Sequence, residues 1–314
     1  MAKTRLIWLA GALALASALY LGWGLRAPMG FILSLRAVKL AALVMVGASV
    51  GAATVMFQTI TQNRLLTPGI VGFDALFILI QTLLVLTLGG IGFSALPEVS
   101  KFAVETACLC VIAILMFGAI LRAGAQDMTR LVLTGVILGI LLRGLTGFVQ
   151  RLLDPSEFAV AQAASFASFS DVSATRLALA APLFLLAMAG ALALAPRLDV
   201  AGLGRIRARA LGIDHDRLVI AALAAVSLLV AVSTALAGPV TFLGLLAASL
   251  GQAILPDWRH RMAIPAAAMT GALILVAGQT VFERLLGLQS TLAVIVEFLG
   301  GLVFLALVLR RQRI

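Results

Sequence analysis

The sequence is poor in charge, in aromatic residues and in the side chains that usually carry chemistry. Only 11% of its 314 residues are charged and 6% are aromatic, and it contains two cysteines and two histidines. A soluble domain has about 25% charged residues. The low charge, together with a hydrophobic content of 62%, excludes a soluble globular domain, and no polar segment is longer than a loop.

Few residues belong to the types that catalyse reactions or bind metals. Cys108 and Cys110 lie two apart in an apolar run, on different sides of a helix, and cannot form a metal site alone. His215 and His260 fall in loops without the His/Glu spacing of a metal site. The chain also lacks a Gly-rich phosphate loop of the Walker type. We therefore predict no catalytic set, no metal site and no ATP bound by this chain.

The chain does have many apolar runs of about 20 residues, the length that crosses a bilayer. Between Arg217 and Asp257 a charge-free stretch is too long for one helix, and Gly238-Pro239 is the natural break. We predict an all-α polytopic membrane protein, a single transmembrane domain over residues 1–314. Its ten helices are expected at 6–25, 40–60, 75–96, 102–121, 131–150, 177–195, 218–236, 240–255, 262–282 and 288–309.

The basic residues predict the orientation. An even number of helices puts both termini on one side, and 15 of the 23 Lys and Arg residues then share that side, against 8 on the other. Basic residues collect in cytoplasmic loops, so both termini are expected in the cytoplasm. The same rule accounts for the net charge of +10, which is scattered over loops and does not form one face for nucleic acid.

Four segments have a character of their own. Arg36 and Lys39 stand three apart at the outer start of the second helix, on one helical face. Residues 58–72 end a helix in polar residues and a Pro-Gly turn, and residues 238–246 break the long apolar stretch. Broken helices at membrane depth are buried in protein or line a pathway. Residues 205–217 carry four arginines and an Ala-Leu-Gly turn, which suggests docking on a cytoplasmic partner.

In this order, the segments resemble the iron-siderophore and vitamin B12 permeases (FecCD-like), the membrane subunits of type II ABC importers. One family pattern, Gln-x-x-x-x-Asn-x-Leu-x-x-Pro-Gly-x-x-Gly, is matched by Gln58, Asn63, Leu65, Pro68, Gly69 and Gly72. Another, Gly-Pro-Val-x-Phe-x-Gly-Leu, is matched by Gly238, Pro239, Val240, Phe242, Gly244 and Leu245. The coupling segment resembles Arg207–Ile213, and a closing Gly-Gly-x-x-Phe is matched by Gly300–Phe304. The resemblance covers nearly the whole chain.

Two departures from the family pattern bear on the substrate. Many members carry Pro-His-x-x-Arg after Gly-Leu, where this chain has Ala247–Gln252, and many carry Leu-Pro near the last helix, where it has Thr291–Gly301. The second departure resembles the branch that takes up catecholate-type siderophores. The resemblance implies a permease subunit that moves a ferric siderophore from the periplasm to the cytoplasm. A cobalamin or haem permease is the alternative within the family.

The resemblance also implies a fold, partners and site residues. The fold would be the ten-helix type II importer fold, in the bacterial inner membrane, paired with a second, homologous permease subunit. A periplasmic siderophore-binding protein would dock at Arg36, Lys39 and Arg284. An ABC ATPase dimer, which holds ATP and Mg, would dock on a coupling loop at about 198–217, through Arg207, Ala208, Arg209, Ala210, Leu211, Gly212, Ile213 and Asp214. The pathway or gate would include Gln58, Gln62, Asn63, Pro68, Gly69, Gly238, Pro239 and Phe242.

Two other classes of function stay open from the residues alone. An ion-coupled secondary transporter would work without an ATPase, but the chain lacks the row of buried carboxylates expected of a proton-driven carrier. Asp74, Glu105 and Glu297 are the only acids near membrane depth, and a structural or interfacial role is expected for each. A membrane-embedded enzyme ranks last, because no pair of catalytic groups lies at a plausible depth.

Overall fold

The computed structural model describes residues 2–24, 28–122, 128–170, 172–255, 259–284, 287 and 292–311. Within these residues the secondary structure is helical and no strand occurs. The elements are α1 (Ala2–Gly22), α2 (Met29–Ile60), the π-helical turn η1 (Gly69–Phe73), α3 (Asp74–Ala95), α4 (Glu98–Arg122), α5 (Met128–Gln150), α6 (Pro155–Ser165), α7 (Ala174–Ala201), α8 (Arg205–Ala210), α9 (His215–Ala237), α10 (Leu243–Ile254), α11 (His260–Arg284) and α12 (Leu292–Arg311).

The predicted all-α, polytopic class is confirmed. Each of the ten expected spans corresponds to one helix, namely α1 to α5, α7 and α9 to α12. In the described part of the chain, seven helices are long and apolar enough to cross a membrane: α1, α2, α3 with η1, α5, α7, α9 and α11. The shorter α10 follows the predicted break directly.

The structure differs from the sequence expectation at the start of the second helix and in one additional helix. The second helix begins at Met29 rather than at residue 40, so Arg36 and Lys39 lie inside it and not at its start. A short helix, α6, was not expected; Asp154 and Glu157 form a capping box around Pro155 at its first turn. The last span was placed from residue 288, and residues 288–291 lie outside the described residues.

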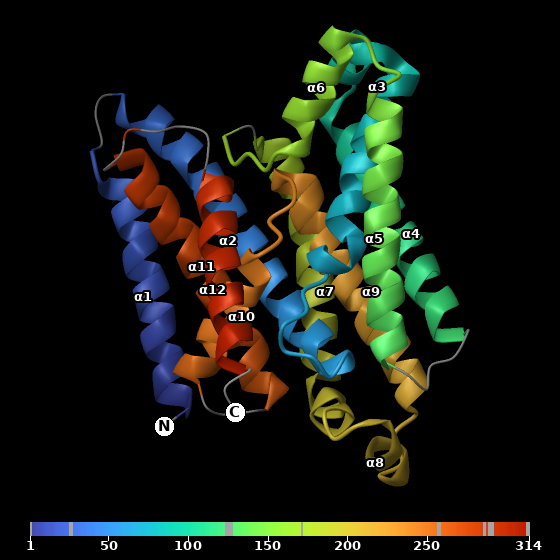
Figure 1. Cartoon of the computed structure of the whole chain (residues 1–314). Helices are drawn as coiled ribbons and strands as arrows, with labels where there is room; N and C mark the ends of the chain where they lie inside the picture. The colour runs from blue at the N-terminus through green and yellow to red at the C-terminus, as the bar shows by residue number, and fades with distance from the viewer. Residues whose placement is uncertain are drawn as a thin grey trace.

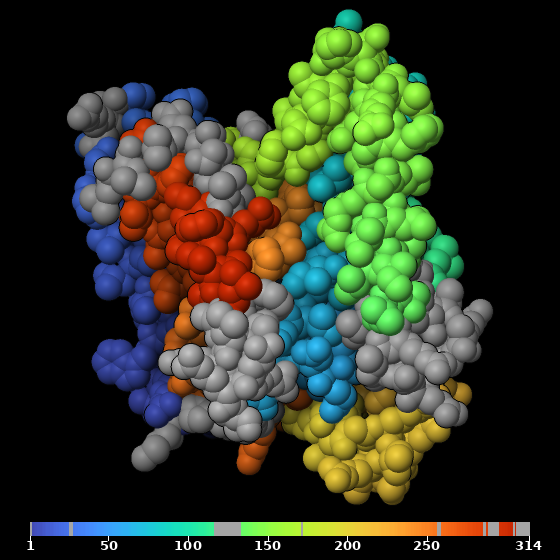
Figure 2. Space-filling model, in the orientation of Figure 1, coloured from blue at the N-terminus to red at the C-terminus, as the bar shows by residue number. Residues whose placement is uncertain are grey.

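The helices form two groups (Figure 1). One group contains α1, α10, α11 and α12, and the other contains α3, α4, α5, α6, α7 and α9. The long α2 runs obliquely from the first group into the second. The start of α1, the end of α12 and α8 lie at one end of the molecule, and α6 lies at the other. In the space-filling view α8, in yellow, projects beyond the helices above it (Figure 2).

The packing is centred on α2, which contacts α11 and α9 more extensively than any other element. Its closest approach to α11 depends on glycines. A Cβ atom on Gly47 would lie 2.5 Å from the backbone nitrogen of Ala272, and one on Gly271 would meet the carbonyl of Gly47. Small residues of this kind let helix backbones touch where lipid offers no hydrophobic drive. The backbones of α2 and α11 are therefore in direct contact at these glycines, with no space for a larger side chain.

Candidate functional site

The three basic residues predicted for the outer rim lie around one cavity. Arg36, Lys39 and Arg284 line a space of about 840 Å³ together with Tyr20 and Glu283. The cavity is at the end of the molecule opposite α8, where α1 and α11 end and α2 begins (Figure 1). The structure thus brings together side chains that are far apart in the sequence.

These cations are partly engaged by the protein itself. Arg36 is only 8% exposed, and its guanidinium donates to the carbonyls of Leu21 (2.7 Å), Trp23 (3.0 Å) and Gly24 (3.2 Å). It therefore caps the C-terminal end of α1, where carbonyls lack helical partners. Lys39 forms an ion pair with Glu283. The three-residue spacing of Arg36 and Lys39 gave no sign of these internal partners.

The polar end of α2 folds back on itself through three of the predicted gate residues. Gln58 is buried and donates from Nε2 to the carbonyl of Arg64 at 2.6 Å. The Asn63 side chain accepts the backbone N–H of Leu65 at 3.0 Å. Gln62 has a φ of 52°, the sole positive value at a non-glycine residue among the described residues. A left-handed residue that is not glycine is strained and is held by its surroundings.

The following turn places a carboxylate in the interior of the protein. Pro68 precedes the π-helical turn, in which Gly72 has a φ of 118°. Asp74 begins α3, is buried, and accepts a hydrogen bond from the Thr241 hydroxyl at 2.6 Å. A Cβ atom on Gly69 would lie 2.5 Å from an Asp74 carboxylate oxygen, so the turn closes over this carboxylate only because Gly69 has no side chain.

The second break, between α9 and α10, lies against the first. Gly238 ends α9 with a φ of 88°, and a Cβ atom there would lie 2.7 Å from the Cα of Ala167. Pro239 follows it, and Phe242 is the last residue before α10 begins at Leu243. The hydrogen bond between Thr241 and Asp74 joins the two breaks. The sequence motifs identified both breaks but not the hydrogen bond between Thr241 and Asp74. The one sign of it in the sequence was Asp74 itself, an isolated acid in an apolar run.

The end of the molecule that contains α8 carries the predicted coupling segment. Its helical part is Arg205–Ala210, so the expected docking residues Arg207–Asp214 lie partly in this helix and partly in the turn after it. Gly212 has a φ of 84° in the turn that follows, and Asp214 caps α9 by accepting the backbone N–H of Arg217 at 3.2 Å. Within α8, Ala208 is fully buried, so the helix is seated on the body of the protein.

Apolar side chains are exposed on α8 and in the turns on either side of it. Ile206 is 87% exposed, Leu211 64% and Leu203 50%, and Arg207 is exposed beside them. Arg205 and Arg209 instead pair with the carboxylate of Asp216, at 3.1 and 2.7 Å. Exposed apolar side chains with a polar border mark sites of protein interaction. Ile206 and Leu203 were absent from the predicted site; their signal was an apolar residue inside a basic run.

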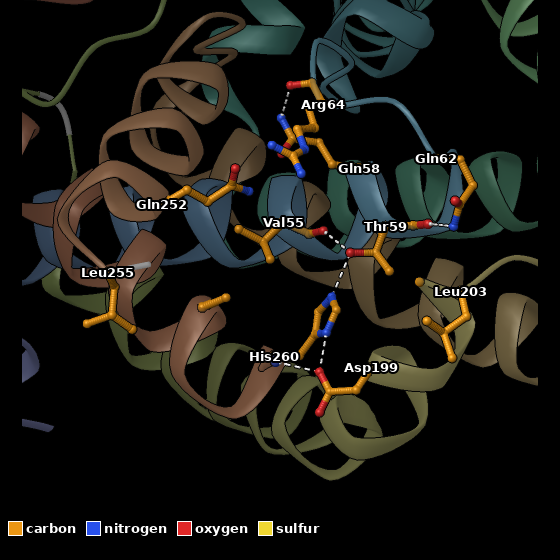
Figure 3. A pocket seen from close by; sticks show the side chains of 12 residues that line it. Val55, Gln58, Thr59, Gln62, Arg64, Asp199, Leu203, Gln252, Leu255 and His260 are labelled. Carbon is orange, nitrogen blue, oxygen red and sulfur yellow. Dashed lines mark hydrogen bonds and ion pairs between the residues drawn. The ribbon is translucent and has the colours of Figure 1, made fainter. Parts of the chain in front are cut away.

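A cavity of about 420 Å³ lies between the inner ends of α2, α7 and α11 (Figure 3). Gln58, Gln62 and Arg64 line it from the end of α2, and Asp199 and His260 line it from the other two helices. His260 was expected in a loop, but it is the first residue of α11 and is buried. His215 likewise starts α9 and is buried. Among the described residues no cluster of three or more potential metal ligands occurs.

Comparison with known proteins identifies the family. The model of the FecCD transport family matches residues 7–310. The chain belongs to the FecCD transport family. The family resemblance seen in the sequence motifs is therefore confirmed, and the chain is a multi-pass transport permease.

Two relatives cover most of this FecCD chain. It is 36% identical over 275 residues to the petrobactin import system permease protein YclO of Bacillus subtilis, covering 88% of this chain and 87% of the relative. It is 30% identical over 277 residues to the petrobactin permease FatC of Bacillus anthracis, covering 88% and 78%. A solved chain, described as a metal-chelate type ABC transporter in an inward-facing conformation, has a TM-score of 0.82 at 22% identity and covers 98% and 99%, which establishes the fold.

Proposed function

We propose that this chain is the membrane permease subunit of an ABC importer for a ferric siderophore of the petrobactin type. The observation that carries the proposal is the 36% identity to a petrobactin permease over almost the full length of both chains. Relatives named for cobalamin and hemin transport share only 27% and 24%. The siderophore is therefore favoured over cobalamin or haem.

The proposed location is the bacterial cytoplasmic membrane, with both termini and α8 in the cytoplasm. The supporting observation is the excess of Lys and Arg in the loops on that side. The start of α1, the end of α12 and α8 share one end of the molecule (Figure 1). The cavity lined by Arg36, Lys39 and Arg284 would then open toward the periplasm.

On the cytoplasmic side, we assign α8 and the turn after it to docking of an ABC ATPase. The apolar side chains of Ile206 and Leu211 would enter a groove of the ATPase, and Arg207 would border the contact. Gly212, in its left-handed turn, would set the angle between α8 and α9. ATP and Mg would be held by the ATPase, and the permease would make and break no covalent bond.

On the periplasmic side, a siderophore-binding protein would dock at the outer rim. Lys39 and Arg284 would steer and orient it through their charge, while Arg36 would hold the rim in shape from beneath. A second permease subunit, homologous to this chain, would complete the transport pathway. The two helix breaks, joined by Asp74 and Thr241, would form part of that pathway and change its accessible side when the ATPase closes.

The test is ATP-driven uptake by the purified complex in proteoliposomes. We expect the tagged chain to co-purify with a P-loop ATPase and a second permease, and the complex with its binding protein to take up ferric petrobactin when ATP is present. The control is the same complex with a hydrolysis-deficient ATPase subunit, and cobalamin and hemin serve as competing substrates. Transport by the chain alone, driven by an ion gradient, would overturn the proposal in favour of a secondary transporter.

A further inference from the structure

Three side chains at the cytoplasmic end form a continuous chain of hydrogen bonds across three helices (Figure 3). Asp199 of α7 accepts from the ring Nδ1 of His260 at 2.6 Å and from the His260 backbone N–H at 2.7 Å. The Nε2 atom of the same ring lies 2.6 Å from the hydroxyl of Thr59 on α2. This set, Asp199, His260 and Thr59, is called the relay below.

The relay begins next to the coupling segment. Asp199 lies in the last turn of α7, and only Gly202–Gly204 separate that helix from α8. Gln62 adds a second link at this point, because its Nε2 donates both to the Thr59 carbonyl at 3.0 Å and to the Ala201 carbonyl at 3.2 Å. A displacement of α8 would therefore act directly on the end of α7, and through it on α2.

The relay ends at the strained reversal of α2. Thr59 also lies 3.0 Å from the carbonyl of Val55, one turn earlier in α2. Its hydroxyl has a single proton, which it donates either to Val55 or to the His260 ring. Because Nδ1 of the ring donates to Asp199, Nε2 of the neutral ring is an acceptor, so the ring is bonded to Thr59 only when the hydroxyl donates to it. Thr59 can thus exchange its hydrogen bond to the His260 ring for one to Val55 within its own helix.

The surroundings allow such a change. The relay borders the 420 Å³ cavity, which gives the side chains of Gln58, Gln62 and His260 space to move. About three turns earlier in α2, its contact with α11 at Gly47 and Gly271 leaves no room for a methyl group, so α2 is fixed against α11 at that level. Motion at this end of α2 is therefore confined to the turn that the relay holds.

We infer that Asp199, His260 and Thr59 are positioning residues that transmit movement of α8 to the gate at the end of α2. This inference rests on the proposed function, because it requires an ATPase to move α8. In one state the relay holds the end of α2 against α7 and α11. In the other, the hydrogen bond between His260 and Thr59 is released and the reversal at Gln62 is free to turn.

The experiment compares variants of each link in the reconstituted complex. Thr59→Val removes the hydroxyl while keeping the shape, and Thr59→Ser restores the hydroxyl. His260→Asn keeps a donor for Asp199 but does not reach Thr59. His260→Gln keeps a polar group that reaches Thr59 but loses the donor to Asp199. Thr270→Val is the control for loss of a threonine hydroxyl, since Thr270 is buried and its hydroxyl bonds to Ala266 of its own helix.

The readout is the amount of ferric petrobactin transported per ATP hydrolysed. We expect Thr59→Val and His260→Asn to lower this ratio about fivefold with ATP hydrolysis little changed, which corresponds to a typical coupling free energy. Thr59→Ser and Thr270→Val should match the unmodified chain. Unchanged ratios in Thr59→Val, or an equal loss of hydrolysis and transport, would overturn the inference, because a purely structural role lowers both together.

A second readout needs no transported substrate. Addition of ATP to the complex should change hydrogen exchange at the backbone amides of residues 59–63, and Thr59→Val should abolish that change while Thr270→Val retains it. The same response in Thr59→Val and in the unmodified chain would overturn the relay. Failure of the proposed function is seen separately, because the unmodified chain would then not co-purify with an ATPase.

Discussion

The two ends of this permease use basic residues in opposite ways. At the outer rim, Arg36 turns inward to the carbonyls of α1 and Lys39 pairs with Glu283. At the inner end, α8 also has paired arginines, but Arg207 is exposed beside Ile206 and Leu211. In the sequence both regions appear as basic clusters at helix ends. The exposed apolar side chains around α8 favour this end as a docking surface, whereas two of the rim cations are engaged by the protein itself.

The largest effect is expected from placing a charge on the apolar side of α8. Ile206→Glu should weaken binding of the ATPase by at least about tenfold, since truncating one central contact residue of an interface costs about 2 kcal/mol or more. The measurement is the yield of ATPase that co-purifies with the tagged chain. Ile206→Val is the control and should retain the ATPase. Normal recovery with Ile206→Glu would show that α8 does not dock there.

A smaller effect, of a different kind, is expected at the outer rim. Arg36→Met removes the guanidinium from three carbonyls, and the free energy of unfolding should fall by about 2–3 kcal/mol, the range for hydrogen bonds to a charged group. Unfolding in mixed detergent micelles measures it. Arg284→Met should leave stability unchanged and weaken docking of the binding protein at low salt. If Arg36→Met instead weakens docking of the binding protein and leaves stability unchanged, Arg36 is a docking residue, and the contrast between the two ends is wrong.

The smallest effect is expected from the ion pairs that hold α8. Asp216→Asn removes the carboxylate that Arg205 and Arg209 share. The Asp216 side chain is 45% exposed. Exposed pairs contribute at most about 1 kcal/mol, so the transport-to-hydrolysis ratio should fall by less than about fivefold. Arg217→Gln, which breaks the more exposed pair with Asp214, is the control and should have no effect. A complete loss of transport in Asp216→Asn would mean that α8 is held mainly by these pairs.

The membrane spans were predictable because each depends on a local property, a run of apolar residues of bilayer length. The start of α2 was misplaced because Arg36 and Lys39 break the apolar run. In the structure the Arg36 guanidinium donates to carbonyls at the end of α1, and Lys39 pairs with Glu283, 244 positions later. The short helices were harder to predict. α6 depends on its capping box, and α8 is too short for a periodic pattern.

The candidate site was predictable only in part, because some of its features are local in the sequence and others depend on contacts between distant helices. The motifs around Gln58 and Gly238 identified two helix breaks, because Pro and Gly interrupt a helix locally. The contact between the breaks, from Thr241 to Asp74, joins residues 167 positions apart. The relay likewise joins Asp199 and His260 to Thr59, from three helices. Pairings of this kind depend on how the helices pack, which the local sequence does not specify.

The central place of α2 has a consequence for the synthesis of the protein. Its polar residues Ser49, Thr54 and Gln58 are buried, and the helices that contact α2 most extensively, α9 and α11, come much later in the chain. The second span therefore enters the bilayer before the helices that enclose it have been made. Until α9 and α11 have been synthesised, the side chains of Ser49, Thr54 and Gln58 cannot be enclosed by them. The packing of α2 is therefore completed late in assembly.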